Sequence, residues 1–234
     1  MEDGFQIVPQ IGKKELPVLK AEETCFLIVD MQNDFVSPNG YFGKVAGQNM
    51  TPVLESVPRV ANFLNYCRRE NIPRVHVQVI HPDYSSASNW KTRIGDLDRS
   101  PKICLPGTWG AEIVPELRPT PDEPVVTKRR YDGFLDTDLV VVLRSLQIKN
   151  LLIAGTKTNV CVDTTARHAF CNDYLTVTLS DCTSTPDPGM QEVALWNLGT
   201  YFGHVCTSDE AKRKLVFSGD GKQRRAAPEI NVSK

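Results

Sequence analysis

Residues 151–170 read LLIAGTKTNVCVDTTARHAF, and this stretch predicts the fold of the whole chain. Its first four residues are a continuous apolar run, which is typical of a parallel strand buried on both faces. A tight turn follows at residues 155–160, and Cys161 then opens a segment whose apolar residues recur at helical spacing. A strand, a turn and a helix in this order make one unit of a parallel α/β sheet.

Similar units occur on both sides of this stretch. Further strands are predicted at residues 25–29, 74–80, 124–127, 174–179 and 204–207. Helices are predicted after Ser56 with Pro58 in the first turn, after a cap at Asp136 or Thr137, and at residues 190–202. Residues 109–117 are weakly helical, and residues 81–105 read as a long loop. Five or six strands with helices between them predict an α/β fold, a doubly wound three-layer αβα sandwich.

The composition suits one large domain. The chain has 234 residues, of which 41% are apolar, and its 27 basic and 28 acidic side chains give a net charge of −1. We expect an N-terminal arm at residues 1–23, a domain at 24–217 and a C-terminal tail at 218–234. Nothing in the charge or the hydropathy favours a nucleic-acid or membrane partner. The mixed N-terminus does not resemble a secretory signal, so a cytoplasmic location is expected.

Three chemically active side chains are predicted at the carboxyl ends of the strands, where open parallel sheets bind ligands. They are Asp30, Lys128 and Cys161. The helix start and the Lys128 ammonium would lower the pKa of the Cys161 thiol, and Asp30 could take its proton. Backbone N–H groups of the turn could stabilise an oxyanion. Taken singly, each residue also has an ordinary interpretation: a turn cap, a solvated lysine and a buried thiol.

Three sequence motifs carry a resemblance to a known family. Residues 28–35 read IVDMQNDF, residues 126–134 read VTKRRYDGF and residues 155–162 read GTKTNVCV. These strings, in this order, resemble the isochorismatase-like cysteine hydrolase superfamily. The resemblance spans roughly Cys25 to Glu210 and implies a six-stranded parallel sheet.

The resemblance also implies a site and a reaction. An Asp–Lys–Cys triad would consist of Asp30, Lys128 and Cys161. The peptide bond between Thr156 and Lys157 would be cis, and the N–H groups of Lys157 and Cys161 would form the oxyanion hole. Hydrolysis of an amide-type C–N bond would then pass through a thioester on Cys161, without a cofactor.

Neither the spacing of the cysteines nor that of the histidines predicts a metal site. The seven cysteines are widely spaced and include no CxxC pair, which also argues against a disulfide framework. Nicotinamidases of the superfamily carry an Asp-x-His metal motif, which residues 77–83 lack. His76 and His81 have no third ligand at a usable spacing.

The motifs favour one branch of the superfamily. Members that act on isochorismate lack the cysteine, so Cys161 favours the amidases. Residues 192–203 and Gly107-Thr108-Trp109 are similar to the ureidoacrylate amidohydrolase group, whereas Leu198 stands where biuret hydrolases present a glutamine. We therefore expect a ureido, carbamoyl or amide substrate. Isochorismate or another superfamily substrate stays open, and so does a catalytically silent binding or assembly protein on the same fold.

The remaining expectations concern the substrate pocket. Lys157 replaces a residue that is usually small in the family, and a side chain that entered the pocket would favour an anionic substrate. Asp132 replaces a usual serine. The resemblance implies a homodimer or homotetramer, in which a neighbouring subunit could complete the site. The residues predicted to bind substrate are Gln32, Phe35, Trp109, Tyr131 and Asn159, with Trp90 as a further aromatic candidate.

Overall fold

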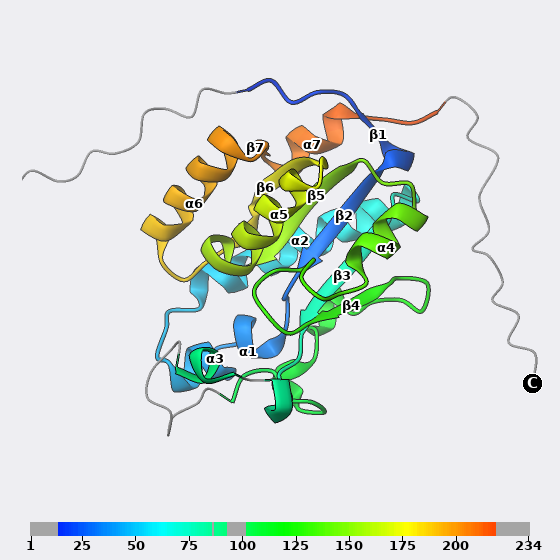
Figure 1. The fold of residues 1–234 in the computed structure, drawn as a ribbon. Helices are drawn as coiled ribbons and strands as arrows, with labels where there is room; N and C mark the ends of the chain where they lie inside the picture. The colour runs from blue at the N-terminus through cyan, green and yellow to red at the C-terminus, as the bar shows by residue number, and fades with distance from the viewer. Residues whose placement is uncertain (1–13, 86, 93–101, 219–234) are drawn as a thin grey trace, which may run out of the picture.

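The computed structural model describes residues 14–85, 87–92 and 102–218, which fold around one parallel sheet (Figure 1). The sheet has six strands and confirms the predicted α/β fold. All neighbouring strands pair in parallel. Their order across the sheet is β4 (Val125–Lys128), β3 (Arg74–Val79), β2 (Thr24–Val29), β5 (Asn150–Thr156), β6 (Leu175–Ser184) and β7 (His204–Cys206).

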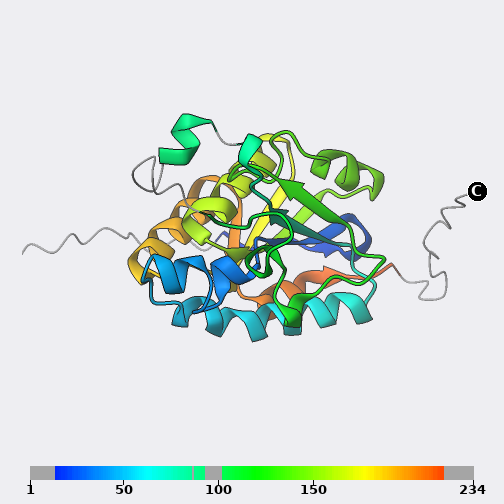
Figure 2. The same ribbon diagram turned by 90° about the horizontal axis from the view of Figure 1, so that it is seen from below.

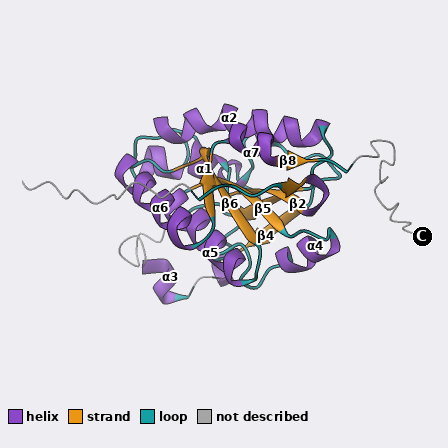
Figure 3. Ribbon diagram, turned by 90° about the horizontal axis from the view of Figure 1, so that it is seen from above, coloured by secondary structure: helices purple, strands orange, loops and turns teal. Residues whose placement is uncertain are grey.

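Helices cover both faces of the sheet and make the three layers that the sequence predicts (Figure 3). One face carries α2 (Thr51–Arg69) and α7 (Ser208–Lys214); the other carries α4 (Leu139–Ser145), α5 (Asp163–Cys171) and α6 (Pro188–Tyr201). Strand β2 therefore has no polar face. Its side chains alternate between the two cores, with Phe26 and Ile28 in one and Leu27 and Val29 in the other.

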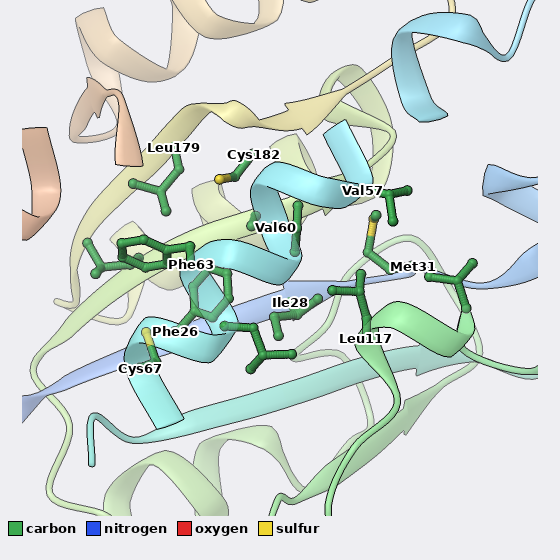
Figure 4. Packing of buried hydrophobic residues seen from close by; sticks show 14 of the residues in the cluster. Phe26, Ile28, Met31, Val57, Val60, Phe63, Cys67, Leu117, Leu179 and Cys182 are labelled. Atoms are coloured by element: carbon green, nitrogen blue, oxygen red, sulfur yellow. The ribbon is translucent and has the colours of Figure 1, made fainter. Parts of the chain in front are cut away.

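The core under α2 explains why that helix lies where it does. Apolar side chains recur along one face of α2 and meet the side chains of β2 (Figure 4). The rings of Phe26 and Phe63 pack edge to face, with their centroids 4.8 Å apart. Among the described residues, no helix is both long enough and apolar enough to span a bilayer.

Four helix starts differ from the sequence prediction. Asp138 rather than Asp136 or Thr137 precedes α4, and α6 begins at Pro188 rather than at residue 190. Helix α2 begins at Thr51 rather than after Ser56, so Pro52 occupies its first turn and Pro58 lies inside it. The missing N–H of Pro58 is tolerated because the helix is held by its buried face. Helix α5 begins only at Asp163, because residues 158–162 form a wider π-helical turn, η7, that contains Cys161.

The connections also contain short elements that the sequence did not predict. Residues 81–105 include α3 (Ser88–Thr92), and residues 109–117 form two 3-10 turns, η5 (Trp109–Ala111) and η6 (Pro115–Leu117). Residues 14–23, from the predicted N-terminal arm, pack against the domain: β1 (Leu19–Lys20) pairs with β8 (Leu215–Val216) and buries Leu19. Residues 1–13 and 219–234 lie outside the described residues.

A buried carboxylate joins α2 to the edge of the sheet. Glu123, just before β4, has a fully buried side chain and accepts hydrogen bonds from Arg68 Nε and Nη2, both at 2.8 Å. Arg74 Nε and His76 Nε2 contact the same carboxyl group from β3. Burial alone would raise the pKa of Glu123, but these hydrogen bonds outweigh it and hold the pKa well below its usual range.

We expect Glu123→Gln to lower the free energy of unfolding by about 2 kcal/mol at pH 7, because two arginines lose their anionic partner. A depressed pKa in the folded state gives stability that is present above the unfolded value of about 4.3 and is lost as the pH falls below it. The free energy of unfolding of Glu123→Gln should therefore come closer to that of wild type when the pH is lowered from 7 to 3.5. Urea unfolding at both pH values measures the two free energies, and Glu116→Gln, at an exposed position, is the control. A difference in free energy that is the same at both pH values would contradict the prediction.

Candidate active site

The site begins with an ion pair at the carboxyl ends of two strands. Asp30 directly follows β2 with φ 52°, a conformation that aspartate tolerates better than most residues. Lys128 is the last residue of β4. Lys128 Nζ lies 2.7 Å from Asp30 Oδ2, and neither side chain has any exposed area. The ammonium also donates to the carbonyl oxygen of Arg130, at 2.9 Å.

The thiol of Cys161 completes this arrangement. Gly155 lets β5 approach β2 closely: its φ is 122°, and a Cβ there would stand 2.0 Å from the carbonyl oxygen of Val29. The turn η7 then returns the chain so that the Cys161 thiol lies beside both Asp30 and Lys128, close enough for each group to shift the pKa of the others. The structure therefore brings together the three side chains that the sequence singled out. Strand β2, which Asp30 follows, ends toward the lower side of Figure 1, the side from which Figure 2 is seen.

The charge state of the three groups follows from their burial. Burial raises the pKa of Asp30, although Lys128 opposes the effect. Burial by itself would lower the pKa of Lys128, but Asp30 and the thiol outweigh it and raise that pKa. Burial also raises the pKa of Cys161, against the attraction of Lys128.

The raised pKa of Cys161 corrects the prediction that a helix start and a nearby lysine would favour the thiolate. The Lys128 charge is already compensated by Asp30, and α5 begins two residues after the thiol. The resting thiol therefore keeps its proton. Asp30, whose own pKa is raised, is placed to accept that proton when the sulfur forms a bond.

The turn after β5 has the backbone that the resemblance implies. The peptide bond between Thr156 and Lys157 is cis. The carbonyl oxygen of Lys157 accepts hydrogen bonds from the N–H groups of Val160 and Val162, at 3.0 and 3.2 Å. These bonds turn the chain between Lys157 and Cys161, whose N–H groups are the predicted oxyanion donors.

A cavity of about 230 Å³ opens onto this site, and both Lys128 and Cys161 line it. Phe35, Tyr131 and Trp90, three of the predicted substrate-pocket residues, line it as well. Further lining residues were not predicted. Phe42, Gln48, His81 and Ile103 come from connections that carry no motif, and Val79 is the last residue of β3. Arg130 and Val160 lie inside two of the motifs, but a motif does not give the direction of each side chain.

Three residues predicted to bind substrate are absent from the lining of this cavity. Gln32 uses its amide for the backbone: it donates to Val79 O and Ala111 O and accepts from Val79 N, each at 2.8 Å. Trp109 is half exposed on η5, and Asn159 lies in η7. Gln32 therefore holds the end of β3 against η5, a positioning role that a motif alone does not distinguish from substrate binding.

The comparison with known proteins adds to this geometry. The model of the Isochorismatase domain matches residues 24–210. The chain belongs to the isochorismatase family. A ureidoacrylate amidohydrolase RutB from Pseudomonas syringae pv. syringae is 35% identical over 219 residues, which cover 84% of this chain and 88% of that protein. The Stutzerimonas stutzeri protein of the same name is 30% identical and covers 95% of this chain and 91% of its own length.

Solved structures of the isochorismatase family share the fold. An isochorismatase family protein from Desulfovibrio vulgaris has a TM-score of 0.71 at 30% identity and covers 82% of this chain and 97% of its own. A cysteine hydrolase from Pseudomonas syringae pv. phaseolicola has the same TM-score at 26% identity, with coverage of 86% and 97%. The chain is thus a hydrolase of the isochorismatase family with amidohydrolase relatives.

Within this isochorismatase-family chain, the described residues contain no group of three or more His, Cys, Asp or Glu side chains able to hold a metal ion. His76 contacts Glu123 away from the cavity, whereas His81 lines it. Asp132 contacts His168 on α5 and accepts from the N–H of Phe134. Neither Asp132 nor His168 is a lining residue of the cavity.

Proposed function

We propose that the chain is a cysteine-dependent amidohydrolase that cleaves a C–N bond of a small ureido, carbamoyl or amide compound. The observation that carries the proposal is the contact of the Cys161 thiol with the Asp30–Lys128 ion pair at the wall of the cavity. Relatives named ureidoacrylate amidohydrolase support the same reaction type. A scaffold that only binds would need neither the buried ion pair nor the thiol beside it.

The first half of the reaction forms a thioester. Cys161 Sγ attacks the carbonyl carbon while Asp30 takes the thiol proton, and the carbonyl oxygen becomes an oxyanion held by the N–H groups of Lys157 and Cys161. Asp30 then passes the proton to the substrate nitrogen, the C–N bond breaks, and ammonia or an amine leaves. The raised pKa of Asp30 favours both transfers, because the carboxyl group holds the proton between them.

The second half returns the enzyme to its resting state. A water molecule attacks the thioester carbonyl while Asp30 takes one of its protons. The tetrahedral intermediate collapses, the C–S bond breaks, and Cys161 leaves as a thiolate that regains the proton from Asp30. Lys128 keeps its positive charge throughout and stabilises whichever of its two neighbours is negative.

A panel of ureido, carbamoyl and primary-amide compounds tests this reaction. We expect ammonia or amine release from at least one class at pH 7 to 8, and rapid quenching should trap an added acyl mass on the peptide that contains Cys161. Where hydrolysis of the thioester is slower than its formation, a burst of the first product precedes steady turnover. Turnover that persists in Cys161→Ala would argue for direct attack by water. No turnover together with an inert Cys161 would favour a binding protein.

A further inference from the structure

The cavity beside Cys161 has a second chemical feature, a lysine that the reaction above does not use through its side chain. Lys157 lines the cavity, and its Nζ donates to Gln48 Oε1 at 2.7 Å and lies 3.5 Å from the ring centroid of Phe42. An ammonium has three donors, and Gln48 accepts only one of them. At least one N–H of Lys157 therefore has neither a carbonyl nor a carboxylate acceptor among the described residues.

A second cation lines the same cavity and is equally without a carboxylate. Arg130 donates from Nη1 to Arg129 O at 2.8 Å and from Nη2 to Ser85 O at 3.0 Å, and its guanidinium lies 4.9 Å from the centroid of the Trp90 ring. These contacts fix its position, but none of them is with a carboxylate. In the described part of the chain, no Asp or Glu forms an ion pair with Arg130 or Lys157.

The rest of the cavity lining is largely apolar, which strengthens the attraction of these cations for an anion. Its apolar side chains include Phe35, Val79 and Ile103. A cation in a partly dehydrated, apolar cavity is stabilised by an opposite charge more than the same cation in water is. Lys128 already has Asp30 as its counterion, whereas Lys157 and Arg130 have no carboxylate partner among residues 14–85, 87–92 and 102–218.

We propose that Lys157 Nζ binds a carboxylate of the substrate, with Arg130 adding to the positive potential, so that the chain selects amides or ureas that carry a negative charge. This inference rests on the proposed function and names Lys157 as a specificity-determining residue. Burial lowers the pKa of Lys157 to about 8, although the neighbouring Cys161 opposes the effect. The anion-binding form is therefore the one present at neutral pH, and it is lost as the pH rises through about 8.

The test compares matched substrates that differ only in charge. Anionic ω-ureido carboxylates with one to three methylene groups are paired with neutral ureas in which an isopropyl group replaces the carboxylate, such as 3-ureidopropionate with 3-methylbutylurea. We expect wild type to prefer at least one anionic member by about 10-fold or more in kcat/KM, the size of a charge-assisted hydrogen bond. Lys157→Met should lower that preference by a similar factor, and Lys157→Glu should shift preference toward the cationic 2-aminoethylurea. Lys44→Met, which removes an exposed charge outside the cavity, should leave the preference unchanged.

A pH series separates charge recognition from a structural role of Lys157. In wild type the KM for the anionic substrate should rise above pH 8 relative to the neutral partner, and Lys157→Met should abolish this relative rise. Thermal unfolding of each variant shows whether it is folded. Equal preference for anionic and neutral members in wild type, or a preference that Lys157→Met leaves intact, would overturn the inference.

A binding measurement keeps the two proposals distinguishable. Cys161→Ser is titrated with the same pairs in a calorimeter, with and without the Lys157→Met change, so that affinity is read without turnover. If the anion binds selectively through Lys157 but wild type hydrolyses none of the compounds, the proposed function is contradicted and the inference is supported. If hydrolysis depends on Cys161 but shows no preference for charge, the proposed function is supported and the inference is contradicted.

Discussion

Replacing Cys161 with alanine is expected to lower kcat/KM by at least about 10⁴-fold, because no group remains that can form the covalent intermediate. Asp30 and Lys128 would still contact each other, so the variant should fold. Cys161→Ser is expected to lose nearly as much, since a serine hydroxyl is a far weaker acid than a thiol and Asp30 would have to remove its proton. Ammonia or amine release from the best substrate of the panel measures both losses.

The matched control for this prediction is Cys171→Ala. Cys171 is an exposed free thiol, the last residue of α5, and does not line the cavity. Its removal should leave both turnover and the trapped acyl mass unchanged, whereas Cys161→Ala should show neither. Turnover in Cys161→Ala within a few-fold of wild type would remove the thiol from the mechanism.

The meeting of Asp30, Lys128 and Cys161 could be predicted from two sources. The carboxyl ends of parallel strands meet at one edge, which made the three residues candidates for one site, and the resemblance of the three motifs to a known family then singled them out together. The pKa direction of Cys161 could not be predicted in the same way. It depends on how completely the sulfur loses water, and a sequence pattern records position along the chain but not the depth of burial.

The walls of the cavity were harder to predict for a related reason. Phe42 and Gln48 both contact Lys157, although Gln48 is 109 residues away in the sequence and Phe42 is further still. They belong to a segment with neither helical nor strand periodicity. Gln32 was predicted to line the pocket and does not. Its position in a motif suggested substrate binding, whereas its side-chain amide forms hydrogen bonds with three backbone groups. The direction of a side chain at the end of a strand is set by tertiary contacts, and only the structure supplies them.

Replacing Lys128 with methionine is expected to lower the free energy of unfolding by about 3 kcal/mol at pH 7.5, because Asp30 is left without its counterion in the interior. Burial already raises the pKa of Asp30, and loss of Lys128 removes the main opposing effect. A carboxyl group with a raised folded-state pKa gives stability that is present below the unfolded value of about 3.9 and is lost as the pH rises through the folded value. The variant should therefore approach wild-type stability near pH 4 and fall below it toward pH 7.5.

The pair Asp30→Asn and Lys128→Met makes this prediction specific to the ion pair. Methionine retains the length and apolar stem of lysine, and asparagine retains the shape of aspartate, so the double variant loses both charges while the packing changes little. If the buried charge is the cause, the double variant should be more stable at pH 7.5 than Lys128→Met alone, and its stability should depend less on pH. Urea unfolding at pH 4 and pH 7.5 gives the free energy of unfolding of wild type, of each single variant and of the double variant, which together make a double-mutant cycle. A double variant as unstable as Lys128→Met would instead trace the loss to packing. All three variants should be nearly inactive, since each lacks either the base or the charge that keeps the base ionised.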